Sequence, residues 1–198
     1  MLKDRVLRPL LATALLFACY SADANPGAGT DAQPAATHSQ QPKAPPSLPS
    51  PTLAVPDDSQ LAFYHDAVGV QIYACQTTKT GYAWTFQAPD AKLFDRRGQL
   101  VLKHYAGPTW ESVSDHSKVV AKKVAEFSAR ADAIPELLLQ VASHEGEGAL
   151  ADVTYIQRLH TTGGLAPISG CDESHVGATA RVDYTATYTF SRLKSHHK

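Results

Sequence analysis

Residues 182–190 read Val-Asp-Tyr-Thr-Ala-Thr-Tyr-Thr-Phe, and this stretch decides the fold class. Successive side chains of a β-strand point to opposite faces, so a polarity period of two indicates a strand with one buried face. The alternation here is complete, and aromatic and β-branched residues of this kind are typical of strands. The predicted inward residues are Val182, Tyr184, Ala186, Tyr188 and Phe190, and the predicted outward ones are Asp183, Thr185, Thr187 and Thr189.

The same period recurs upstream and predicts further short strands. Segment 134–142 is apolar without alternation, which fits either a strand buried on both faces or a short helix opened by Pro135. Gly, Pro and Asp turns separate the segments, and no rhythm of strands alternating with long helices is present. The alternating segments are 68–75, 82–86, 100–104, 109–113, 119–124 and 152–159.

These segments predict an all-β fold, an antiparallel sandwich or barrel with short helical or irregular insertions. We expect one β-rich domain over residues 57–193, followed by a disordered basic tail at 194–198. The formal net charge of −1 gives no basic patch for nucleic acid. Beyond the N-terminal segment, no apolar stretch approaches the roughly 18 residues that a membrane span needs.

The first 24 residues are typical of a signal peptide. Residues 1–9 are basic, residues 10–19 are apolar, and small residues favour cleavage after Ala24. A second interpretation is a lipobox at residues 16–19, in which Cys19 is lipidated and anchors the chain. In both cases we expect an exported protein, periplasmic or secreted, with an outer-envelope lipoprotein as the alternative.

Residues 25–56 follow as a Pro/Ala/Ser-rich segment. Seven of the thirteen prolines fall between residues 25 and 52. This composition offers little apolar area to offset the entropy of ordering the chain, so a disordered linker is expected.

Two cysteines remain in the predicted domain, Cys75 and Cys171. An even pair in an exported chain predicts a disulfide. The bridge would close a loop of roughly a hundred residues, a stabilisation of about 4–5 kcal/mol in the chain-entropy model. Neither a CxxC spacing nor neighbouring metal ligands accompany the pair.

His104, Glu111 and Asp115 are weak candidates for catalysis. A histidine and two carboxylates on neighbouring strands are suited to general acid–base chemistry or to a divalent metal. His104 also shares its predicted face with Leu100 and Leu102, which fits a histidine hydrogen-bonded in the core. No residue is assigned to a resident metal, and no cofactor is indicated.

Trp110, Gln157 and Arg158 are weak candidates for ligand contact. Gln157 and Arg158 precede a Gly-Gly turn at a strand end, where loops often carry function. The forked guanidinium of Arg158 is suited to a carboxylate or phosphate. The alternatives are packing for Trp110 and an Arg–Asp pair beside a glycine turn for Arg158.

Several longer motifs occur together, namely residues 71–75 (QIYAC), 104–111 (HYAGPTWE), 153–158 (VTYIQR), 162–167 (TGGLAP) and 184–188 (YTATY). Together they resemble the secreted bacterial and fungal family called domain of unknown function 3455, over residues of about 60 to 190. Some fungal members carry a malate dehydrogenase label, whereas this sequence has no dinucleotide-binding fingerprint. His116 stands where the family pattern has Gly, and Glu136 stands where it has Trp.

The leading functional prediction is a non-enzymatic exported module that binds a small molecule, a glycan or an envelope partner. Aromatic strand faces and Gly/Pro-rich loops without an assembled catalytic set favour it. One alternative is an extracytoplasmic, metal-dependent enzyme that uses His104 with Glu111 or Asp115. A second alternative is a structural envelope protein.

Overall fold

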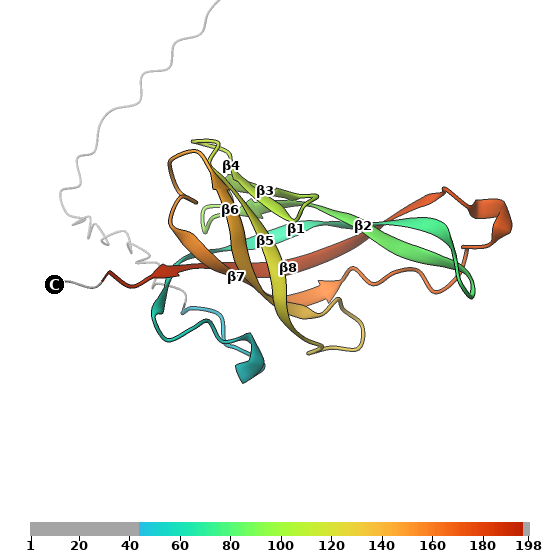
Figure 1. The fold of residues 1–198 in the computed structure, drawn as a ribbon, viewed down its shortest axis with the longest axis horizontal. Coiled ribbons are helices and arrows are strands. Elements are labelled where there is room, and N and C mark those ends of the chain that lie inside the picture. Colours follow the sequence, from blue (N-terminus) through green and yellow to red (C-terminus); the bar gives the residue numbers. More distant parts are fainter. Residues whose placement is uncertain (1–43, 196–198) are drawn as a thin grey trace, which may run out of the picture. The chain divides into compact units, whose positions relative to one another are not determined.

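The computed structural model describes residues 44–195 (Figure 1). The predicted signal peptide with Cys19, residues 25–43 of the predicted linker and the end of the tail lie outside the described residues. Within the described part, no helix is long and apolar enough to cross a membrane.

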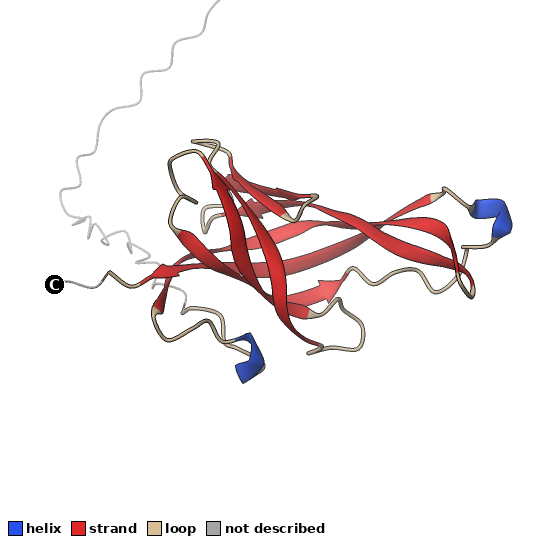
Figure 2. Cartoon of the chain, viewed as in Figure 1, coloured by secondary structure: helices blue, strands red, loops and turns tan. Residues whose placement is uncertain are grey.

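Eight antiparallel strands close into a barrel in sequence order, with β1 pairing with β8. The prediction of an all-β antiparallel fold is therefore confirmed, and of the two architectures the structure shows the barrel. The helical content of the described chain is two 3-10 turns, η1 (Pro51–Leu53) and η2 (Glu173–His175) (Figure 2). The strands are β1 (Ser59–Thr78), β2 (Gly81–Phe94), β3 (Leu100–Tyr105), β4 (Thr109–Ser112), β5 (Lys118–Phe127), β6 (Glu136–Glu145), β7 (Val153–Gly163) and β8 (Thr179–Leu193).

The apolar segment 134–142, for which the sequence left a strand or a helix open, forms the start of strand β6. Leu139 faces the main core and Leu138 a second cluster on the outer face. Both faces of β6 are thus covered, which explains why the sequence shows no alternation there.

Strand β8 follows the predicted alternation on its inner face. Tyr184, Ala186, Tyr188 and Phe190 all belong to the main core. The outward residues Thr187 and Thr189 are also buried, which the sequence did not predict. Thr189 donates to the Gln157 side chain at 2.6 Å, and Gln157 donates to the Leu53 carbonyl oxygen at 2.6 Å.

The N-terminal segment provides this outer cover, and it corrects the predicted linker. We expected disorder through residue 56, yet η1 packs against the barrel and Leu53 is 0% exposed. Leu53 forms the second cluster with Leu138 and Leu159. Ser50 caps η1 by accepting from the Thr52 amide at 3.3 Å, and Pro51 occupies the first position, as proline prefers.

Three strands run past the barrel and form a protruding arm (Figure 1). The β2–β3 pairing ends at Ala91–His104 and the β7–β8 pairing ends at Gly163–Tyr184. Beyond these points β1, β2 and the first residues of β8 pair only with one another. We use "the arm" for residues 72–88 and 165–183.

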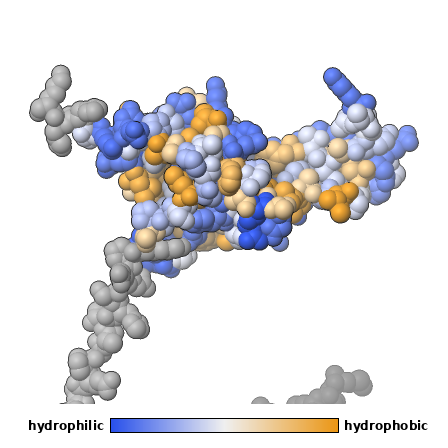
Figure 3. Space-filling model, turned by 90° about the horizontal axis from the view of Figure 1, so that it is seen from below, coloured by the Kyte–Doolittle hydropathy of each residue, from blue (hydrophilic) through white to orange (hydrophobic). Residues whose placement is uncertain are grey.

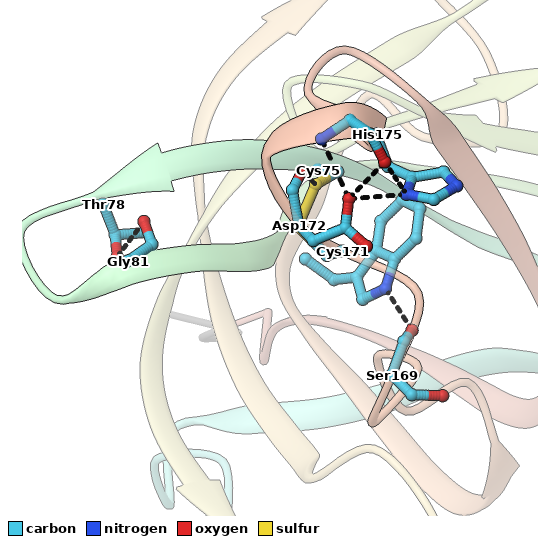
Figure 4. The surroundings of a disulfide bond; sticks show 9 residues. Cys75, Thr78, Gly81, Ser169, Cys171, Asp172 and His175 are labelled. Carbon is cyan, nitrogen blue, oxygen red and sulfur yellow. Dashed lines mark hydrogen bonds and ion pairs between the residues drawn. A yellow bond between two sulfur atoms is a disulfide. The ribbon is translucent and has the colours of Figure 1, made fainter.

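A disulfide between Cys75 and Cys171 crosses the arm, as predicted. It joins β1 to the loop that carries η2 (Figure 4). The same loop is held by the Trp84 indole, which donates to the Ser169 carbonyl oxygen at 2.8 Å. Asp172 caps η2 and accepts from the Ser174 amide at 2.9 Å.

Candidate functional site

The barrel encloses a cavity of about 670 Å³ at the end where the arm begins. Every strand contributes at least one lining residue, so the cavity reaches into the barrel interior, and exposed residues such as Phe86 and Lys123 line its open mouth. Its volume lies within the range of about 300–1,000 Å³ that is typical of small-molecule sites. Apolar side chains also lie on the outside of the molecule, over the barrel and on the arm, set among polar ones (Figure 3).

Most of the lining is apolar and aromatic. β2 contributes Phe86 and Pro89, the β3–β4 turn contributes Pro108, and β6 contributes Leu137 and Leu139. The Phe86 ring meets the Tyr73 ring edge-on with centroids 5.9 Å apart, so the wall continues from the barrel onto the arm.

His104, Trp110 and Tyr188 form an aromatic wall inside the barrel. The His104 ring stacks on Trp110 with centroids 4.0 Å apart, and Tyr188 meets both rings edge-on. The Nδ1 atom of His104 lies 2.9 Å from the Thr109 carbonyl oxygen. Because a carbonyl only accepts, Nδ1 carries a proton. Burial lowers the pKa of His104 to about 3, so the ring is neutral and Nε2 is an acceptor.

Arg158 brings a positive charge to the cavity lining. It pairs in register with Tyr188 on β8 and with Leu137 on β6, and all three line the cavity. Its Nε and Nη2 atoms donate to the Pro135 carbonyl oxygen at 3.2 and 2.8 Å. Within residues 44–195, no carboxylate lies within ion-pair distance of this guanidinium.

Two buried donors in the lining have no hydrogen-bond partner among the described residues. They are Nε2 of Gln71 and Nε1 of Trp110, on side chains of residues 3% and 1% exposed. A buried donor without a partner costs about 1–3 kcal/mol. A buried donor without a partner calls for an explanation, and a bound molecule that accepts the hydrogen bond is one.

A glycine turn shapes the wall beside Gln71. Gly164 has a φ of +79°, and a Cβ atom there would lie 2.9 Å from the Tyr184 Cβ. Its carbonyl oxygen accepts from the Tyr73 hydroxyl at 2.6 Å. Glycine at this position therefore lets the β7 end approach β8 closely while it fixes the Tyr73 ring.

The family described as protein of unknown function (DUF3455) matches residues 56–192, more than half of the chain. The chain belongs to the DUF3455 family. No curated protein and no solved structure matched it.

Four of the five motifs by which the chain resembles DUF3455 contribute a residue to the cavity lining. Residues 71–75 supply Gln71, residues 104–111 supply His104 and residues 153–158 supply Arg158, while residues 184–188 supply Tyr188. The four motifs are far apart in the sequence and are brought together by closure of the barrel.

Glu136 lies away from the cavity. It is 3% exposed and accepts from the His160 amide through Oε1 at 2.9 Å. A separate hollow beneath Ser47 and Pro49 contains it, so its environment is the N-terminal cover.

The structure does not bring His104, Glu111 and Asp115 together. His104 faces the interior, whereas Glu111 pairs in register with Lys103 on the outer face. The Glu111 carboxylate accepts from the Tyr105 hydroxyl at 2.8 Å, a contact that lowers the pKa of Glu111. Burial and the same hydrogen bond raise the pKa of Tyr105. In the described part of the chain, no cluster of three or more His, Cys, Asp or Glu side chains is arranged to hold a metal ion.

Asp115 organises the β4–β5 turn. Its carboxylate accepts from the Ser117 hydroxyl at 2.6 Å and from the Ala149 amide at 3.0 Å. These hydrogen bonds hold its pKa below the ordinary range. All its contacts are with the neighbouring turns.

Of the three predicted ligand-contact residues, Trp110 and Arg158 line the cavity and Gln157 does not. Gln157 and Arg158 are neighbours on β7 and so point to opposite faces. Gln71, Tyr73 and Tyr188 are lining residues that sequence reasoning left out. Strand alternation in the sequence shows which face each of these residues occupies, but it does not show that a cavity lies beside them.

Proposed function

We propose that the domain is an extracytoplasmic binding module that takes a small organic molecule into the barrel cavity. The observation that carries this proposal is the pair of buried, unpartnered donors in an apolar cavity of about 670 Å³. A scaffold without a ligand gains nothing from leaving these atoms unpaired. The cavity size favours a small molecule over the glycan and the envelope partner that the sequence left open.

The location of the protein is part of the same proposal. The Cys75–Cys171 disulfide supports an oxidising compartment, where such bonds form and persist. The N-terminal signal predicted from the sequence supports export to such a compartment. Cleavage after Ala24 and lipidation of Cys19 are both compatible with this location, because each belongs to an exported protein.

The test is a thermal-shift screen of the full chain against small organic acids, amines, sugars and neutral aromatics. A ligand at 100 times its Kd stabilises the folded state by about 2.7 kcal/mol, which is visible as a rise in Tm. Ala121→Phe fills the cavity from β5, where Ala121 is 1% exposed and lines the wall. Ala83→Phe makes the same change at an exposed position of the arm.

Compounds that bind in the cavity raise the Tm of the wild type and of Ala83→Phe but not that of Ala121→Phe. Far-UV circular dichroism confirms that each variant is folded. A screen without any shift, or hits that stabilise Ala121→Phe equally, would contradict the proposal.

A further inference from the structure

We propose that the ligand is a small carboxylic acid with an apolar body, and that Arg158 receives its carboxylate. This inference rests on the proposed binding function and names the chemistry of the molecule that the cavity takes.

The first support is that Arg158 has no charged partner among the described residues. Two of its three nitrogens share one acceptor, the Pro135 carbonyl oxygen, which carries no charge. The Tyr188 side chain is also a hydrogen-bond partner of Arg158, and it too is uncharged. No carboxylate of residues 44–195 pairs with this guanidinium. A guanidinium that is partly removed from water is stabilised by an anion in fork geometry, and a carboxylate matches that fork.

The second support is the position of the charge. Arg158 acts electrostatically on the hydroxyls of Tyr73 and Tyr188, opposing the burial that raises the pKa of both. Arg158 lies on β7 in register with Tyr188 of β8, and the same cavity wall carries Gln71 and the neutral His104.

The charges of the whole lining point the same way. They are three cations and one carboxylate, Glu126, which already pairs with Lys123 at the β5 rim. The complete chain carries a formal charge of −1, so this local excess of positive charge is not a reflection of composition. A positively charged cleft with apolar walls concentrates anions.

The remaining hydrogen-bond capacity also fits a carboxylate. Nε2 of Gln71 and Nε1 of Trp110 are both donors, and a carboxylate accepts through two oxygens with about four lone-pair directions. An ammonium ion has no acceptor lone pair, so it would leave these donors unpaired, and it would be repelled by Arg158.

The apolar walls select the rest of the molecule. Phe86, Pro89, Leu137 and Leu139 offer no charged partner, so the part of the ligand that lies against them is apolar. We therefore expect carboxylic acids with an aromatic or aliphatic body.

The experiment compares acids with their own amides in the full chain at pH 7.5 by isothermal titration calorimetry. Phenylacetate is paired with phenylacetamide, and hexanoate with hexanamide, so that shape is matched and only charge differs. We expect each acid to bind at least tenfold more tightly than its amide, since hydrogen bonds to charged groups are worth more than neutral ones. This comparison needs no variant.

Arg158→Gln is expected to reduce acid binding to the level of the amide. Arg97→Gln, at an exposed turn position, is expected to change nothing. If Arg158→Gln fails to fold, Arg158→Lys keeps the charge but loses the fork, and an intermediate preference is expected.

Equal binding of acid and amide to the wild type would overturn the inference, as would an acid preference that survives in folded Arg158→Gln. Binding of inorganic phosphate or phenyl phosphate without binding of the acids would overturn it too. In each of these cases the proposed binding function still stands if neutral compounds from the screen raise the Tm of the wild type but not that of Ala121→Phe. The absence of any binding compound removes both proposals together.

Discussion

At the scale of single residues, burial of His104 predicts that stability depends on pH. A histidine in an unfolded chain has a pKa of about 6.5, whereas burial lowers the pKa of His104 to about 3. Between these values the unfolded state binds more protons than the folded one. The free energy of unfolding should therefore fall as the pH is lowered below about 6.5, by up to about 1.4 kcal/mol per pH unit. Urea denaturation at pH 7, 6 and 5 measures this slope.

His104→Gln separates this contribution from the others, because glutamine can still donate to the Thr109 carbonyl oxygen but does not titrate. His65, whose pKa burial also lowers, retains its share of the slope in the variant. The slope of His104→Gln should be clearly shallower than that of the wild type. An identical slope in both proteins would show that His104 is not neutral in the folded state.

Single residues also show how much of the site the sequence could reveal. Ile156 and Arg158 fall on one face of an alternating segment and Gln157 on the other, which is visible without a structure. Both faces of β7 are covered, however, so alternation could not tell which side borders a cavity. Gln71 was equally hard to recognise, because its Nε2 atom is buried without a partner only once strands far along the chain pack around it.

At the scale of elements, the segment before β1 is the clearest departure from expectation. Its proline content predicts disorder, but a few apolar residues are enough to bind it to the barrel. Leu53 fills a gap over Leu138 and Leu159, and Gln157 holds its carbonyl oxygen. Composition averages over a segment, whereas packing depends on the one side chain that meets a vacant apolar surface.

Leu53→Ala should therefore destabilise the whole domain. Removal of a fully buried leucine side chain costs about 2–5 kcal/mol, since the cavity left behind adds to the lost burial. Leu48→Ala is the matched control, because Leu48 is 44% exposed and surface changes typically stay within about 0.5 kcal/mol. Urea midpoints at constant m-value measure both. A Leu53→Ala variant as stable as the control would mean that this segment is a free linker after all.

At the scale of the whole molecule, the barrel and the arm differ in how they are held. The barrel has a continuous core from Ala67 to Phe190, which explains why the strand pattern alone predicted an all-β fold. Closure depends on β1 meeting β8, the two ends of the domain, and no local pattern encodes such a pairing. The arm likewise depends on strand lengths and register, which no local pattern encodes. The pairing of β7 with β8 ends at Tyr184, whereas β1 continues to Thr78 and extends beyond the barrel.

The disulfide is the main constraint on the arm, and removing it should affect the two parts unequally. Cys75 and Cys171 are 96 residues apart, so the chain-entropy model gives a loss of about 4–5 kcal/mol for Cys75→Ser/Cys171→Ser. The backbone bonds between Cys75 and residues 177–178 and the hydrogen bond from Trp84 to Ser169 then hold the loop, and amide exchange should quicken there first. Strands β3 to β6 make no contact with the bridge and should keep their protection once the variant is folded.

A reducing agent should produce the same change in the wild type and none in the double variant. Equal exchange throughout both proteins would mean that the bridge does not organise the arm, whereas uniform loss of protection would mean that barrel and arm unfold as a single unit.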